Sequence, residues 1–240
     1  MDAYAAQTIG RRANQEDSYG IKHFPTGTLA IICDGMGGHA LGDRASRVAV
    51  DAFLEVFEVQ AGVTLREALL AALMHANICV GDIFIDSDVI GGCTLVAAYV
   101  TKSSITWVSV GDSPLFLWRA NRLIRLNADH SMRSVFSDLT LPGSSYTDAA
   151  QRGHMLRSAL TGEDITLIDL SRTPYPLLPR DRVILASDGV EDLLYLNCLT
   201  ADTEASLNDP NPNLAVRLVE ANSQLDAPFA DNCTVISLDI

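Results

Sequence analysis

The sequence predicts an α+β fold in which two mostly antiparallel sheets stack face to face, flanked by pairs of helices that cover their outer faces. Two long segments repeat apolar residues at helical spacing, and a series of short β-rich runs separated by turn residues follows them. Strands and helices do not alternate one by one, which disfavours a doubly wound parallel sheet. Hydrophobic residues make up 48% of the 240 residues, enough for one large core, so we expect one domain over residues 1–240.

Three helices are expected from the pattern. Residues 42–57 place apolar side chains three and four positions apart along one continuous stripe. Residues 64–84 carry a second stripe, and Thr64, with Glu67 three positions later, has the spacing of a capping box. A third helix is expected from about residue 213 to 224. The two stripes predict that one face of each helix packs against apolar side chains.

Short apolar runs with turn residues between them predict the strands. Four runs after Gly92 have the intervals of an antiparallel meander. Residues 127–157 then lose periodicity and are rich in Ser, Asp, Thr and Gly, which predicts a mobile flap. The expected strands are residues 93–101, 104–111, 114–120, 122–127, 165–171, 182–187 and 233–240.

The charge of the chain limits its partners. The formal net charge is −13 with a pI near 4.6, so the average surface repels nucleic acid and anionic lipid. The N-terminus lacks a basic region followed by an apolar one, and no stretch reaches the roughly 18 uncharged apolar residues of a spanning helix. The five cysteines are scattered without a CxxC pair, which indicates reduced thiols rather than a zinc site. We expect a cytoplasmic protein that neither binds nucleic acid nor inserts into a membrane.

Four aspartates stand at the ends of apolar β-type runs. Asp34, Asp112 and Asp188 each follow such a run, and Asp231 precedes one. Any one of them alone is more often a turn or helix-cap residue. Stacked sheets, however, bring strand ends together at one rim, where grouped carboxylates repel each other unless a cation neutralises them. An all-oxygen donor set without Cys or His pairs indicates Mg²⁺ or Mn²⁺ rather than zinc.

Two neighbouring features fit such a site. Gly35 has no Cβ, so its carbonyl oxygen can approach an ion closely, and Asp34 beside it could bridge two ions. Near the N-terminus, Arg12 precedes Glu16 by four residues, so one loop can supply a guanidinium for phosphate and a carboxylate for metal. An arginine and an acid on a loop are usually only solvated charges, so this motif is weak by itself.

Six motifs in order carry a family resemblance. They are RxxxED at 12–17, DGMGGH at 34–39, GCT at 92–94, GDS at 111–113, SDG at 187–189 and DN at 231–232. Together they resemble the metal-dependent protein phosphatases, also called the PPM or protein phosphatase 2C family. The likeness extends from Arg12 to Thr234, and DGMGGH is similar to the bacterial branch.

The resemblance implies a four-layer αββα sandwich and a protein serine/threonine phosphatase that uses two Mg²⁺ or Mn²⁺ ions. It also implies direct attack on phosphorus by a hydroxide that bridges the ions. In this assignment Asp34 bridges both ions and Arg12 holds the phosphate. The other assigned residues are Asp188 and Asp231 on one ion, Glu16 and the Gly35 carbonyl on the other, Asp112 with Asp188 at a weaker third site, and Asp17 beside the ligands.

The sequence departs from the family pattern at three positions. Met36 stands where animal relatives have a His, and His39 is the nearby candidate for protonating the leaving group; a histidine that merely hydrogen bonds within its loop is an equally good alternative. Cys93 and Pro114 replace a Thr or Ser and an Arg that are usual in the family. Neither change removes an assigned ligand, so we expect local repacking rather than lost activity.

Two longer segments narrow the resemblance. GDSPLFLWRANRLIRLNADHSM and LRSALTG are similar to the small stand-alone phosphatases of bacterial type VI secretion loci, which oppose a Ser/Thr kinase. The implied partners are proteins phosphorylated on Ser or Thr, a cognate bacterial kinase and its substrates. The alternative function is a phosphatase-fold binding module without turnover. A haloacid-dehalogenase-type phosphatase is disfavoured, because LIDLSRT does not supply the DxDxT nucleophile.

Overall fold

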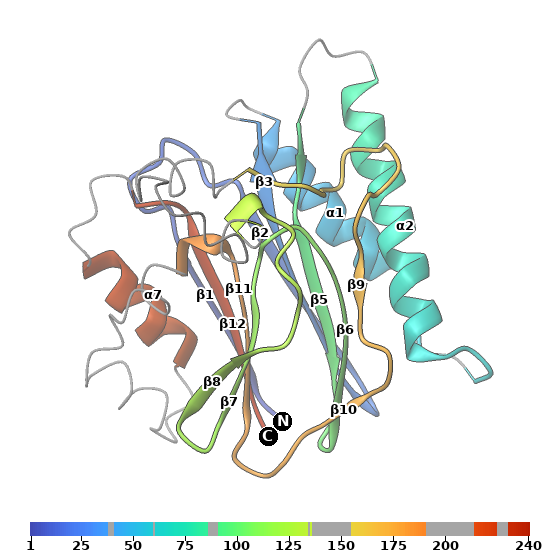
Figure 1. The fold of residues 1–240 in the computed structure, drawn as a ribbon, viewed down its shortest axis with the longest axis vertical. Helices are drawn as coiled ribbons and strands as arrows, with labels where there is room; N and C mark the ends of the chain where they lie inside the picture. The colour runs from blue at the N-terminus through green and yellow to red at the C-terminus, as the bar shows by residue number, and fades with distance from the viewer. Residues whose placement is uncertain are drawn as a thin grey trace.

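The fold is a sandwich of two antiparallel sheets with helices on the outer face of each (Figure 1). All strand pairs within both sheets are antiparallel. The α+β sandwich predicted from the sequence is therefore confirmed. The computed structural model describes residues 1–37, 41–59, 61–85, 91–133, 135, 155–190, 214–224 and 230–240.

Each sheet combines strands that are distant in the chain. The five-stranded sheet has the order β1 (Ala3–Thr8), β12 (Cys233–Asp239), β11 (Arg182–Ala186), β7 (Leu115–Arg119) and β8 (Arg122–Arg125). The seven-stranded sheet has the order β10 (Tyr175–Pro176), β6 (Ser104–Val110), β5 (Leu95–Val100), β3 (Gly27–Met36) and β2 (Asp17–Phe24), with β4 (Gly92–Cys93) paired to β3 and β9 (Asp169–Leu170) paired to β6.

Helices cover both outer faces. α1 (Gly42–Val56) and α2 (Leu65–Phe84) lie on the seven-stranded sheet, and α7 (Leu214–Gln224) lies on the five-stranded one (Figure 1). The expected capping box of α2 is present, because Thr64 and Glu67 exchange side-chain and main-chain hydrogen bonds. Residues 191–213 and 225–229 lie outside the described residues, so a second helix beside α7 stays a prediction.

The expected four-strand meander is wrong in one respect. β5 and β6 pair in the seven-stranded sheet, whereas β7 and β8 pair in the five-stranded sheet. The chain crosses between the sheets through residues 111–114, where Gly111 has a φ of +99° and Pro114 has no amide hydrogen for a ladder. This crossing places Asp112 at the rim of the sandwich.

Other strand predictions differ at their bounds. The strand expected over residues 165–171 is shortened to β9 (Asp169–Leu170). The Ser158 hydroxyl accepts from the Leu167 amide at 3.0 Å and donates to the Leu167 carbonyl at 2.9 Å, so these two groups are not available to a neighbouring strand. β1 and β2 were not expected from the sequence. Their side chains are mostly only partly buried, so neither has the continuous apolar run of a central strand.

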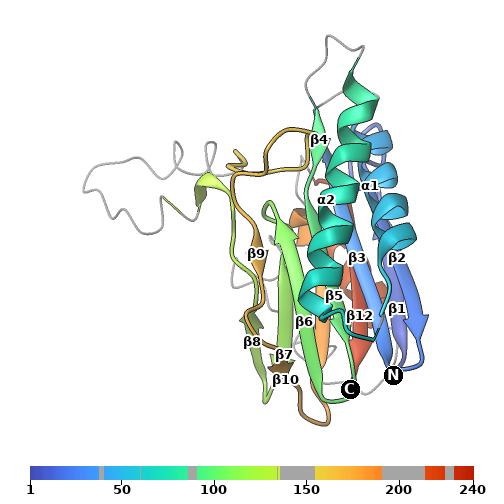
Figure 2. The same ribbon diagram turned by 90° about the vertical axis from the view of Figure 1, so that its right-hand side faces the viewer.

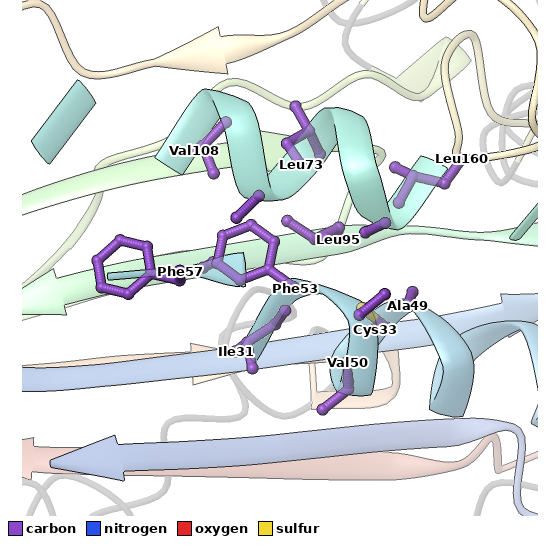
Figure 3. Close-up of a cluster of buried hydrophobic side chains, with 14 of the residues drawn as sticks. Ile31, Cys33, Ala49, Val50, Phe53, Phe57, Leu73, Leu95, Val108 and Leu160 are labelled. Atoms are coloured by element: carbon purple, nitrogen blue, oxygen red, sulfur yellow. The ribbon is translucent and has the colours of Figure 1, made fainter. Parts of the chain in front are cut away.

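β3 is buried on both faces, and this determines where Asp34 points. Leu29, Ile31 and Cys33 belong to the core beneath α1 and α2, together with Phe53 of α1 (Figure 3). The alternate residues of β3, such as Ile32, belong to the core between the two sheets. Because side chains alternate along a strand, Asp34 continues the inter-sheet row at the rim. A third core lies between the five-stranded sheet and α7.

The described cysteines have no disulfide. Cys33, Cys93 and Cys233 are buried thiols, and Cys79 is partly exposed. Cys198 lies outside the described residues.

α2 is a strongly apolar helix on the outer face of the seven-stranded sheet. Its mean hydropathy is 1.4 over 18 residues, so among the described helices it has the length and composition of a membrane span. The helix contains Arg66, Glu67 and Asp82, so it does not contradict the expectation that no stretch of about 18 residues is both uncharged and apolar. α2 packs beside α1 (Figure 2), and Leu69 and Leu73 are fully buried. Leu70, Met74 and Ile78 of the same helix are exposed, so these contacts account for only part of its apolar character.

Candidate metal centre

A cleft of about 1090 Å³ opens at the rim where β3, β6 and β11 end and β12 begins. Seven of the nine predicted site residues line it. Asp17 lies beside this group, and His39 falls outside the described residues. The seven are Arg12, Glu16, Asp34, Gly35, Asp112, Asp188 and Asp231.

Thr94 fixes the main chain of Asp34. The Asp34 amide donates to Oγ1 of Thr94 at 3.1 Å, and the Thr94 amide donates to the Asp34 carbonyl at 2.8 Å. Oγ1 of Thr94 also lies 2.6 Å from Oγ of Ser113, the residue after Asp112. One buried threonine therefore links the strand that carries Asp34 to the turn that carries Asp112.

Asp17 joins the two sheets at the rim. It lies directly opposite Asp34 in the β2–β3 register. Its Oδ2 accepts hydrogen bonds from Oγ of Ser187 at 2.8 Å and Oγ1 of Thr234 at 2.6 Å, both from the five-stranded sheet. Its Oδ1 is buried and has no hydrogen-bond partner within the described part of the chain. A buried carboxylate oxygen left in this way favours a nearby positive charge or donor.

Asn232 holds the N-terminal loop over the cleft. Its Oδ1 accepts from the Glu16 amide at 2.7 Å, and its Nδ2 donates to the carbonyls of Ile9 and Asn14 at 2.9 and 3.0 Å. The loop between β1 and β2, which carries Glu16, is thus attached to the start of β12. Asn232 belongs to the DN motif, but no role for it was predicted from the sequence.

The Glu16 side chain lies at the beginning of α1. Its Oε2 would be 2.8 Å from a Cβ placed on Gly42, the first residue of that helix. The unpaired amides and the dipole at a helix N-terminus favour a carboxylate there. Gly35 lies against the same loop, because its amide donates to the Glu16 carbonyl at 3.0 Å.

Gly35→Ala is expected to lower the free energy of unfolding by about 1–3 kcal/mol. A Cβ at this position would lie 2.2 Å from the Gly42 carbonyl oxygen and 2.8 Å from that of Glu16, both main-chain atoms. In Gly20→Ala the added Cβ would meet side-chain atoms of Leu54, Val50 and Ile31, which can move. Urea unfolding of both variants makes the comparison, and equal losses would contradict this explanation.

Arg12 contacts a predicted metal ligand. Its Nη2 lies 2.5 Å from Oδ2 of Asp231, and the two side chains are 57% and 36% exposed. The family resemblance implies that this guanidinium holds the phosphate. An exposed ion pair contributes only about 0–1 kcal/mol, so a phosphate in the cleft can compete with Asp231 for Arg12.

Burial and neighbouring acids raise the pKa of three carboxyls at the cleft. Burial raises the pKa of Asp34 well above its usual value, and Asp17, Asp188, Asp112 and Asp231 raise it further by charge repulsion. Burial and the neighbouring Asp188 raise the pKa of Asp112 to about 7. Burial raises that of Asp17 to about 7, against the lowering effect of its two hydroxyl donors. Grouped carboxylates that share little solvent favour a bound cation.

The donor set fits divalent ions that keep part of their water. All proposed donors are carboxylate or carbonyl oxygens, which Mg²⁺ and Mn²⁺ prefer. No group of three His, Cys, Asp or Glu side chains among the described residues is arranged to hold an ion as it stands. Mg²⁺ commonly binds through one or two carboxylates and several waters, so a triad of side chains is not required.

Two further arginines line the cleft, and the sequence motifs did not predict them. Arg133 and Arg157 line it together with Met155. Arg133 precedes and Met155 and Arg157 follow the part of the predicted flap, residues 134 and 136–154, that lies outside the described residues. The sequence feature that could have predicted these basic residues is a pair of arginines on either side of a Ser-rich segment, in a chain of net charge −13.

The stacked sheets and the carboxylate-lined cleft are the features that the ordered motifs predicted for a protein of the phosphatase 2C class. A family model described as protein phosphatase 2C matches residues 6–209. The chain belongs to this family, which confirms the resemblance.

Bacterial relatives agree with this assignment. The chain is 30% identical over 236 residues to the serine/threonine phosphatase stp of Listeria welshimeri, covering 88% of this chain and 92% of that protein. It is 28% identical over 232 residues to the serine/threonine protein phosphatase PstP of Mycobacterium tuberculosis, covering 95% of this chain. The chain spans only 43% of the length of PstP.

Solved structures share the fold. The catalytic domain of PstP in complex with two manganese ions is 27% identical and has a TM-score of 0.79, covering 99% of this chain and 97% of that one. PppA, described as a key regulatory component of T6SS in Pseudomonas aeruginosa, is 26% identical with a TM-score of 0.76, covering 99% and 96%.

Proposed function

We propose that this protein is a metal-dependent protein serine/threonine phosphatase. The observation that carries the proposal is the meeting of seven predicted residues, from widely separated parts of the sequence, in one cleft. The match to stp of Listeria over 92% of its length supports the activity, and the manganese ions of the PstP structure support the cofactor. We infer that residues 1–240 form one catalytic domain.

Each carboxylate of the cleft is assigned to one or two of the metal ions. Asp34 lies centrally, since all four neighbouring acids act on its pKa, and it would bridge two Mg²⁺ or Mn²⁺ ions. The remaining assignments are Asp188 and Asp231 for one ion, Glu16 and the Gly35 carbonyl for the other, and Asp112 with Asp188 for a third. When bound, the ions supply an activated water for attack on phosphorus and neutralise phosphate charge.

Three further predicted residues would act on the substrate and on the ligands. Arg12, released from Asp231, would bind the phosphate oxygens with its planar guanidinium. Asp17 would hold its neighbours in place through Ser187 and Thr234. His39 would donate the proton that the leaving group requires, a role worth about 10²- to 10⁴-fold in rate.

Removal of divalent ions is expected to abolish hydrolysis. The purified protein should hydrolyse p-nitrophenyl phosphate and a phosphothreonine peptide with Mn²⁺ or Mg²⁺, lose both activities in excess EDTA, and regain them when the metal is restored. Phosphate release measures the rate. A folded protein that binds Mn²⁺ and turns over neither substrate would instead support the binding module without turnover.

The proposed partners are proteins phosphorylated on Ser or Thr, with a cognate bacterial kinase and its substrates. The likeness to PppA supports a role of this kind beside a secretion apparatus. The acidic surface supports the exclusion of nucleic acid, and we infer a cytoplasmic location without membrane insertion from the sequence.

A further inference from the structure

Gly111 and His130 exchange two hydrogen bonds beside the cleft. The His130 amide donates to the Gly111 carbonyl at 3.1 Å, and the Gly111 amide donates to Nδ1 of His130 at 3.3 Å. Gly111 has a φ of +99°, and a Cβ on it would lie 2.7 Å from the Thr94 side chain. This glycine therefore turns the chain sharply in a confined space just before Asp112.

The residues before His130 hold the rest of the same turn. Nη2 of Arg125 donates to the Asp112 carbonyl at 2.6 Å. Nδ2 of Asn127 donates to the Ser113 carbonyl at 3.0 Å, and its Oδ1 accepts from the Leu115 amide at 2.8 Å. Side chains of one segment thus bind the main chain of each residue in the GDS turn.

His130 differs from its neighbours in what it contributes. It is 6% exposed and does not appear among the described residues that line the cleft. Because Nδ1 accepts from the Gly111 amide, the neutral ring carries its proton on Nε2. Burial lowers the pKa of His130 and so favours this neutral form. Within the described residues the hydrogen bond of its ring is made to Gly111, whereas its main-chain carbonyl accepts from the Arg157 amide at 2.8 Å, so the ring acts on the cleft through Gly111.

We propose that His130 is a positioning residue for Asp112. The hydrogen bonds of His130 to the amide and the carbonyl of Gly111 hold the main chain there, and this fixes the direction in which the Asp112 side chain enters the cleft. The inference rests on the proposed function, in which Asp112 helps to bind the third divalent ion. Replacing a residue that hydrogen bonds to a metal ligand and orients it commonly weakens metal affinity about 10- to 100-fold.

Two variants of similar size separate the acceptor atom from the bulk of the ring. His130→Leu fills the space but has no acceptor for the Gly111 amide. His130→Asn places its Oδ1 near the position of Nδ1 and keeps that acceptor. Calorimetric titration of the metal-free protein with MnCl₂ should show the weakest binding event weakened about 10- to 100-fold in His130→Leu. His130→Asn should stay within about threefold of the wild type, and the tighter events should not change.

Combination with Asp112→Asn tests whether His130 acts through that carboxylate. In the Asp112→Asn background, His130→Leu should cause no further loss of Mn²⁺ affinity, since the ligand it positions is gone. Additive losses, an unchanged isotherm in His130→Leu, or equal losses in His130→Leu and His130→Asn would each overturn the proposal. If His130→Leu does not fold, His130→Gln takes its place, because its acceptor lies one bond further out.

These titrations do not depend on turnover. A protein that binds Mn²⁺ with the predicted His130 dependence but hydrolyses no phosphopeptide would contradict the proposed function and leave this inference standing. If Asp112→Asn changes none of the Mn²⁺ binding events seen in the wild type, the inference is overturned, whether or not the protein has phosphatase activity.

Discussion

Asp34→Asn is expected to lower kcat on a phosphothreonine peptide by about 10³-fold or more, equivalent to about 4 kcal/mol of lost transition-state stabilisation. Asp34 lies at the end of the inter-sheet face of β3, within the charge field of Asp17, Asp112, Asp188 and Asp231. An amide keeps the size of the side chain but cannot neutralise two cations. Steady-state kinetics at saturating Mn²⁺ measure the loss.

Asp82→Asn is the matched control for this variant. It makes the same change of charge and shape on the exposed surface of α2, outside the residues that line the cleft. It should leave kcat unchanged. If Asp34→Asn folds and keeps more than a tenth of the wild-type kcat, Asp34 does not bridge the ions.

The metal-free protein is expected to be less stable at pH 8 than at pH 5.5. Burial raises the pKa of Asp17 and of Asp112 from 3.8 to about 7. Between these values the folded protein holds protons that the unfolded chain has released, so the free energy of unfolding falls as the pH rises. The contribution of the protonated carboxyls is complete below about pH 3.8 and is lost as the pH passes about 7. For one isolated group this rise corresponds to about 4 kcal/mol, and for interacting groups to less.

Thermal unfolding in EDTA at the two pH values measures this effect. Saturating MnCl₂ at pH 8 should reverse it, because an ion that binds only the folded protein stabilises it by about 2.7 kcal/mol at 100 times its Kd. Each kcal/mol corresponds to about 2–4 °C in Tm for a chain of this size.

Asp17→Asn identifies the source of the pH dependence. Its side chain does not titrate, so the fall in stability between pH 5.5 and pH 8 should be smaller than in the wild type. Burial lowers the pKa of His130, which acts with the opposite sign in both proteins and cancels in the comparison. An identical pH dependence in the two proteins would rule out Asp17 as a contributor.

Local sequence patterns predicted most of the secondary structure. The stripe of residues 42–57 became α1, and the Thr64–Glu67 spacing became the capping box of α2. The sequence also placed Asp112 and Asp188 after strands and Asp231 before one, whereas Asp34, expected after its apolar run, lies within β3, which continues to Met36. Such features depend on the period of apolar side chains and on residues a few positions apart, so they can be identified without knowledge of the partner strands.

The sequence by itself determined the two stacked sheets, the covering helices and the acids at the strand ends, because burial and turn formation act locally. Only the tertiary structure decided which distant groups meet: Arg12 with Asp231, 219 positions apart, Asn232 with the loop before β2, and His130 with Gly111. It also decided that the chain changes sheets at residues 111–114. These pairings arise from how the two sheets pack, and the spacing of apolar residues carries no information about that geometry.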